Sequence, residues 1–163
     1  MNANTVIAVC AIVIAGASLV VSVYEARATR MHNRYSVRPI LELGTSFKVG
    51  ATAGLILRNS GLGPAAVTTS SLSFKGVLLG EFNESNVNQV RDALKSARPS
   101  AVTLGGKPFV HTGYEGFLLS VESYDRSQHR EFYELIRQHL RVEIQYDSIY
   151  GGERFKAVHS PGL

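Results

Sequence analysis

The sequence predicts an N-terminal transmembrane α-helix followed by a mainly-β domain, an Ig-like β-sandwich with one or two amphipathic helices packed on it. Residues 5–24 form a run of twenty residues without a charged side chain. Four arginines follow before Pro39, and beyond it short apolar segments alternate with glycine-rich turns. We therefore divide the chain into a tail and span at 1–24, a basic juxtamembrane segment at 25–38 and a sandwich-like soluble domain at 39–163.

The apolar run has the length of a membrane span. At about 1.5 Å per residue, a helix over residues 5–24 is about 30 Å long, which matches the hydrocarbon thickness of a bilayer. A domain of this size rarely surrounds so long a helix with apolar contacts, so we interpret the run as transmembrane. Tyr24 lies at its end, where interfacial aromatic residues are common.

A cleaved signal peptide is the main alternative. Ala26-Arg27-Ala28 has the small-x-small form of a cleavage site. Against this, residues 1–4 contain no Lys or Arg, and the apolar run exceeds the roughly 7–15 residues typical of a signal peptide.

Basic residues on only one side of the span predict its orientation. Arg27, Arg30, Arg34 and Arg38 follow the span, and no basic residue precedes it. Because such residues stay cytoplasmic, we expect the N-terminus outside and the C-terminal domain in the cytoplasm, at the inner (plasma) membrane. The arginines thus act as topology and membrane-surface residues, each contributing about 1 kcal/mol beside anionic headgroups.

The span also contains small residues at helical spacing. Ala11 and Ala15 match the small-xxx-small pattern that lets transmembrane helices approach closely, and Gly16 lies beside them. This predicts a helix–helix contact and hence a homo-oligomer. Cys10, the single cysteine, lies in the same run, so no intramolecular disulfide can form.

Outside the juxtamembrane segment the charges nearly balance. The chain has 17 basic and 13 acidic residues, and four of the basic and one of the acidic ones lie at 25–38. A nucleic-acid interface would require basic residues clustered on the domain itself. We therefore expect no nucleic-acid partner.

Short apolar segments predict a series of strands. They lie at 40–43, with Phe47 and Val49 continuing the first, and at 54–58, 67–74, 77–82, 101–104, 115–121, 141–147 and 154–158. In the clearest pair, Val142, Ile144 and Tyr146 alternate with polar residues, and Gly151-Gly152 turns the chain into the last strand.

Two segments have helical spacing instead. One is 84–97, where Val87, Val90, Leu94 and Ala97 share a face, and Pro99 follows it. The other is 127–140, with an apolar stripe of Phe132, Leu135, Ile136 and Leu140. We expect both helices to pack on the sheets.

Loops on β scaffolds commonly carry recognition. We predict interaction loops at the turns 59–64 and 146–152, with the residues Asn59, Gly61, Gly63, Pro64, Tyr146 and Tyr150, and name the loop 105–113 as a further candidate. The first turn is not a phosphate-binding loop, because no Lys-Ser/Thr pair opens a helix after it.

No pattern of catalytic or metal-ligating residues emerges. The five histidines, His32, His111, His129, His139 and His159, lack metal-ligand spacing. Glu131 and Glu134 lie near Arg130 and Arg137, which is typical of a salt-bridged helix surface. No G-x-S-x-G elbow occurs. We therefore predict no catalytic residue, no cofactor and no metal, and expect that the protein is not an enzyme.

Three short stretches resemble a known group of proteins: HNRYSVRP at 32–39, NSGLGPA at 59–65 and YDSIYG at 146–151. With these, the chain resembles small bacterial and prophage-associated single-pass membrane proteins. The resemblance implies a membrane anchor followed by a compact β-rich soluble domain, and it implies no activity.

Together these features predict a membrane-anchored protein-interaction module, a binding or adaptor protein whose protein partner the sequence does not identify. One alternative is a membrane-active effector that works through oligomerisation of its transmembrane helix. The other is an extracytoplasmic domain exported by a signal-like anchor.

Overall fold

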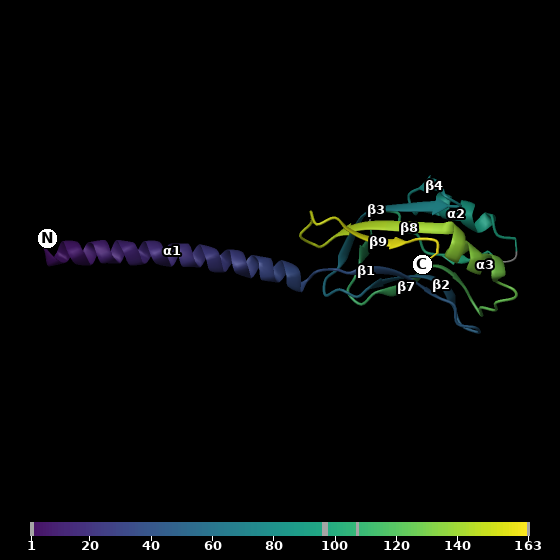
Figure 1. Ribbon diagram of the computed structural model, residues 1–163, viewed down its shortest axis with the longest axis horizontal. Coiled ribbons are helices and arrows are strands. Elements are labelled where there is room, and N and C mark those ends of the chain that lie inside the picture. The colour runs from purple at the N-terminus through teal and green to yellow at the C-terminus, as the bar shows by residue number, and fades with distance from the viewer. Residues whose placement is uncertain (1, 96–97, 107, 163) are drawn as a thin grey trace. The chain divides into compact units, whose positions relative to one another are not determined.

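The computed structural model describes residues 2–95, 98–106 and 108–162, and the chain divides into two compact units. The first is a helix that ends at Ser36, and the second, called the body below, begins at Val37 (Figure 1). A long apolar helix followed by a β-rich region with two sheets confirms the coarse architecture expected from the sequence.

The N-terminal helix is longer than the apolar run. α1 extends over Ala3–Ser36, 34 residues, and none of its side chains is buried. An 18-residue window has a mean hydropathy of 2.8, so α1 is long and apolar enough to cross a membrane, a property that a signal sequence shares. The helix continues through the basic segment because no Gly or Pro lies between Glu25 and Ser36. It ends before Pro39, which disfavours helical backbone at Arg38.

The body contains two antiparallel sheets. Sheet A has the strand order β1-β2-β7-β5, and sheet B has the order β4-β3-β8-β9 with β6 also pairing to β3. The strands are β1 Leu41–Ser46, β2 Ala53–Asn59, β3 Ala65–Phe74, β4 Val77–Gly80, β5 Ser100–Ala101, β6 Phe109–Val110, β7 Glu115–Val121, β8 Leu140–Asp147 and β9 Phe155–His159.

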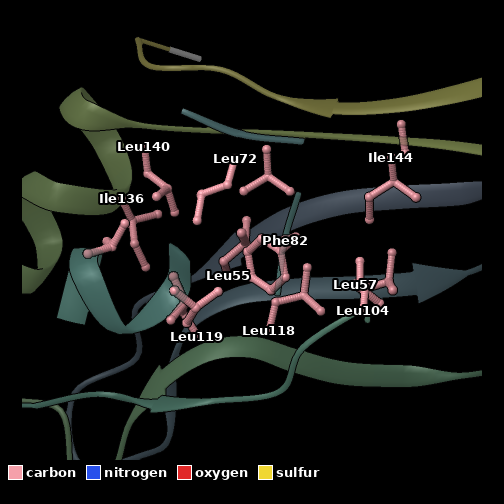
Figure 2. Packing of buried hydrophobic residues seen from close by; sticks show 14 of the residues in the cluster. Leu55, Leu57, Leu72, Phe82, Leu104, Leu118, Leu119, Ile136, Leu140 and Ile144 are labelled. Carbon is pink, nitrogen blue, oxygen red and sulfur yellow. The ribbon is translucent and has the colours of Figure 1, made fainter. Parts of the chain in front are cut away.

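One hydrophobic core fills the space between the sheets (Figure 2). Leu55 and Leu118 come from sheet A, Leu72 and Ile144 come from sheet B, and Phe82 is fully buried in the same cluster. Each such side chain contributes about 1.5–3 kcal/mol by leaving water. The predicted strands at 54–58, 67–74, 115–121, 141–147 and 154–158 agree with the structure because their apolar residues are those that the core requires. Two predictions were wrong in part: β1 ends at Ser46, before Phe47 and Val49, and the segment 101–104 is a strand only at its first residue.

The first predicted amphipathic helix is shorter than expected. α2 covers Glu84–Asp92 and buries Val87 and Val90. Asn83 caps it by accepting a hydrogen bond from the Asn86 N–H through its side-chain oxygen, at 3.0 Å. The helix had been expected to reach Ala97, which lies outside the described residues. β6 was not predicted, since two residues carry no periodic signal.

The second predicted helix changes character before it ends. α3 covers Arg130–Glu134, a π-helical turn follows at Leu135–His139, and Leu140 already belongs to β8. The prediction of a helix up to Leu140 was therefore wrong at its C-terminal end, although the whole apolar stripe is buried.

Three carbonyl oxygens of the π-helical turn accept hydrogen bonds from donors in distant segments of the chain. His159 Nε2 bonds to Ile136 O, the Gly162 N–H to Arg137 O and the Lys75 N–H to His139 O, at 2.9, 2.9 and 2.8 Å. A carbonyl oxygen can only accept, so Nε2 of His159 carries the proton. These bonds let the helix pass directly into a strand without a terminal glycine.

Burial lowers the pKa of His159, since the imidazole is 5% exposed. Between its lowered pKa and the ordinary value of about 6.5, the unfolded chain binds a proton that the folded chain does not. The free energy of unfolding is therefore at its full value above about pH 6.5 and decreases as the pH falls below it.

We expect the full chain in detergent to lose stability to urea between pH 7.5 and 5, measured by the near-ultraviolet circular dichroism of its tyrosines. His159→Gln keeps a donor without titrating near neutrality, so it should lose less over the same range. Equal losses in both proteins would contradict this role of His159.

Candidate functional site

One end of the body gathers the predicted interaction loops. This proximal end comprises segment 37–40, where the body begins, and three loops at 59–65, 108–114 and 147–155. β2 and β8 end there, whereas β1, β3, β7 and β9 begin there. Antiparallel topology thus brings together segments that are more than a hundred residues apart in the chain.

Asn59 joins these segments with its side-chain amide. Its oxygen accepts hydrogen bonds from the N–H groups of Ile40 and Gly61, at 3.2 and 3.1 Å. Its nitrogen donates to the carbonyl oxygens of Gly63 and Val110, at 2.9 and 3.0 Å. The residue is only 2% exposed. Asn59 therefore holds the proximal end together and is not itself available to a partner.

The two glycines of the same loop allow the chain to approach closely. A Cβ atom on Gly63 would lie 1.8 Å from the carbonyl oxygen of Val37, and one on Gly61 would lie 2.5 Å from that of Arg38. The Leu62 N–H donates to the same Arg38 oxygen at 3.1 Å. Only glycine fits at these two positions, so both hold the first residues of the body in place.

Tyr146 also has a structural role. It is 4% exposed, and its hydroxyl oxygen accepts a hydrogen bond from the Leu41 N–H at 3.1 Å. This bond links β8 of sheet B to β1 of sheet A. Its ring lies 5.6 Å from that of Phe155. The structure therefore places four of the predicted loop residues, Asn59, Gly61, Gly63 and Tyr146, in the interior, and Pro64 is half-buried.

The β8–β9 loop is held by its own hydrogen bonds. The Ser148 hydroxyl donates to Glu153 Oε1 at 2.7 Å and accepts from the Tyr150 N–H at 3.1 Å. The Arg154 N–H donates to Asp147 Oδ1 at 2.6 Å. This backbone hydrogen bond is the main reason why the pKa of Asp147 lies below its ordinary value. The loop thus has a defined conformation.

Apolar side chains project from this ordered loop and its neighbours. Ile149 and Tyr150 are 54% and 45% exposed, and Leu62, in the β2–β3 loop, and Phe109, in β6, are 74% and 70% exposed. All four lie within segments that the sequence predicted as interaction loops, but sequence reasoning named only Tyr150 and did not single out the other three. Their types alone cannot distinguish them from core residues, because burial of each depends on the register of the strands beside it.

The four predicted topology arginines divide between the two units. Arg38 belongs to the body, where its guanidinium group lies 4.5 Å from the centre of the Phe155 ring. Arg27, Arg30 and Arg34 lie on α1. At about 100° per residue they occupy an arc of about 60°, so all three share one face of the helix.

The predicted helix–helix contact residues lie nearer the N-terminus of the same helix. Ala11 and Ala15 are one turn apart on one face of α1, and Gly16 is next to Ala15. The hydroxyl groups of Ser18 and Ser22 donate to carbonyl oxygens one turn earlier in the helix, at 2.8 and 2.9 Å. These two serines are therefore satisfied within α1.

The acidic and histidine side chains of the body form no catalytic constellation among the described residues. Glu134 pairs with Arg130 at 2.8 Å on an exposed surface, and Glu131 accepts a hydrogen bond from the Lys95 N–H. These two glutamates line an open hollow of about 200 Å³ with His139. No group of three His, Cys, Asp or Glu that could hold a metal ion occurs in the part of the chain that is described.

Comparison with known proteins adds no assignment, since no family model, curated protein or solved structure matches the chain. Any function of the proximal end therefore has to be inferred from its structure. Its distinctive feature is the ordered, partly apolar β8–β9 loop at the proximal end.

The network around Asn59 makes a prediction about stability. Asn59→Ala should lower the free energy of unfolding by about 3 kcal/mol or more, because several buried N–H and C=O groups lose their partners. Urea unfolding of the full chain in detergent measures this. The control is Gln89→Ala on the exposed surface of α2, for which we expect a change within about 0.5 kcal/mol. Equal effects of the two substitutions would contradict the role of Asn59.

Proposed function

We propose that the protein is a membrane-anchored, non-enzymatic binding module. In this proposal α1 crosses the inner membrane with its N-terminus outside, and the body, an Ig-like β-sandwich, lies in the cytoplasm and binds a protein partner. The observation that carries the proposal is the β8–β9 loop, whose internal hydrogen bonds fix a backbone that exposes Ile149 and Tyr150.

An ordered loop with exposed apolar and aromatic side chains has the properties of a binding surface. Binding costs less when the loop does not have to be ordered on contact. Tyr is enriched among the residues that dominate binding energy, because it combines a large apolar surface with a hydroxyl group. Leu62 and Phe109, at the same end of the body, add further exposed apolar surface there.

Anchoring is supported by the length and hydropathy of α1 and by the basic residues that follow its apolar part. A tethered module meets a partner at the membrane at a raised effective concentration, so a modest apolar surface suffices for binding. In this proposal the anchor and the β8–β9 loop therefore contribute to the same binding event.

The proposal can be tested by placing a photo-crosslinking amino acid at Tyr150 of the full chain in cells. The matched control is the same amino acid at Val49, which is 68% exposed and lies in the β1–β2 connection, away from the proximal end. We expect discrete crosslinked products from Tyr150 only, and Ile149→Ser should reduce them at least several-fold. The same products from both positions, or none from Tyr150, would contradict the proposal.

The side of the membrane is checked in parallel with Ser85→Cys in a Cys10→Ala background, since Ser85 is exposed on α2. We expect a membrane-impermeant thiol reagent to label it only after lysis. Labelling in intact cells would favour the exported domain and direct the crosslinking analysis to envelope proteins.

A membrane-active effector is the second candidate, and one observation favours it: the Ala11–Ala15 face of α1 is exposed. Ala15→Leu separates the two functions, because it blocks close helix approach without shortening the span. A binding module should keep its Tyr150 crosslinks after this substitution. An effector should lose its oligomer, which crosslinking through Cys10 would detect.

A further inference from the structure

The three arginines of α1, Arg27, Arg30 and Arg34, have defined angular positions around the helix axis. Relative to Arg27, Arg30 lies at about −60° and Arg34 at about −20° around the helix axis. The stripe is about 10 Å long, since neighbouring arginines are about 4.5 and 6 Å apart along the axis. This arrangement exists only because α1 continues without a break from Ala3 to Ser36.

Apolar side chains form a second stripe directly beside the first. Tyr24, Met31 and Tyr35 lie at about 40–80° from Arg27. They are 70%, 59% and 70% exposed on the helix. Basic and aromatic residues together are typical of a helix surface at a bilayer interface.

The opposite side of the helix is polar and carries the only acid of the segment. Glu25 lies at about 160° and His32 at about 140° from Arg27. The segment therefore has one side suited to anionic lipid and another suited to water. Positive charge that served topology alone would not need this phase, because orientation depends on how many basic residues lie near the end of a span.

The distance from the apolar run sets which arginines reach the headgroups. Arg27, Arg30 and Arg34 lie about 4.5, 9 and 15 Å beyond Tyr24 along the axis. A headgroup layer is about 5–8 Å thick, so an upright helix would place Arg27 within it, Arg30 at its edge and Arg34 outside it. Tilting toward the stripe brings all three arginines closer to the bilayer, whereas tilting away moves them further from it, and transmembrane helices commonly tilt by about 20°.

We propose that Arg27, Arg30 and Arg34 form a binding site for the phosphate groups of anionic phospholipids, and that this site sets the direction in which α1 tilts. The proposal rests on the proposed function, in which α1 spans the membrane. Guanidinium groups suit the ligand because they bind phosphate oxygens through paired donors. Tyr24, at the end of the apolar run, lies where an interfacial aromatic ring packs beside the acyl chains.

The test uses a sole tryptophan at Tyr24→Trp, since the chain has no Trp. The full chain is reconstituted into vesicles of equal phosphatidylglycerol and phosphatidylcholine, with bromine near the headgroup of one lipid or the other. Quenching should show roughly fivefold enrichment of phosphatidylglycerol beside the helix, the ratio expected from about 1 kcal/mol. Flotation with the vesicles confirms that the chain is inserted.

The matched control exchanges Arg30 with Thr29 and Arg34 with Asn33. The variant Thr29→Arg/Arg30→Thr/Asn33→Arg/Arg34→Asn keeps composition and net charge but moves these two arginines to about 200° and 240°. We expect it to lose most of the enrichment while it still floats and keeps the tyrosine circular dichroism of the body. Unchanged enrichment of phosphatidylglycerol in this variant would overturn the proposed binding site, because net charge alone would then explain the enrichment.

Two further outcomes are decisive. Equal quenching by both lipids in a chain that floats would overturn the lipid site alone, whereas a chain that does not float would overturn the anchor and the site together. Excess inorganic phosphate, compared with sodium chloride at equal ionic strength, should not abolish the enrichment. If it does, the stripe binds soluble phosphate and not lipid.

Discussion

The buried amide of Asn59 bonds to three segments that meet at the proximal end of the body. Without it, the N–H of Gly61 and the carbonyl oxygens of Gly63 and Val110 would be buried without these partners. The close approach of Val37 at Gly63 requires both the missing side chain and this set of bonds. Since α1 ends at Ser36 and the body begins at Val37, the first residues after the helix are held by the core of the body.

The same end of the body combines interior order with an exposed apolar surface. Tyr146 links the two sheets through the N–H of Leu41, and two residues later the chain enters a loop closed by the hydrogen bond between Ser148 and Glu153. The rigidity of that loop is therefore connected to the network of the proximal end through β8. Exposed side chains such as Tyr150 can then keep one arrangement without being buried themselves, which is the condition for recognition at low entropic cost.

Sequence patterns predicted most of the strands because the apolar positions in each strand are set by which side chains enter the core. Alternation in β8 and apolar spacing in β2, β3 and β7 follow directly from which side chains face the interior. Long-range partners carried no such signal. The role of Asn59 depends on Ile40 and Val110, and the π-helical turn depends on His159, which is twenty-three residues beyond Ile136. A turn motif and a lone histidine look ordinary until the fold supplies their partners.

The basic segment 25–38 also shows what the sequence alone can and cannot predict. Counting its arginines predicts which side of a membrane the chain prefers, and the count needs no structure. Their phase becomes meaningful only when Glu25–Ser36 is known to be helical, because a flexible segment would present the charges on all sides. Because the helix is continuous, the arginines lie on one defined face of it. Gly61 and Gly63 impose a comparable restriction within the body, because the backbone at Val37 and Arg38 approaches them more closely than any side chain would allow.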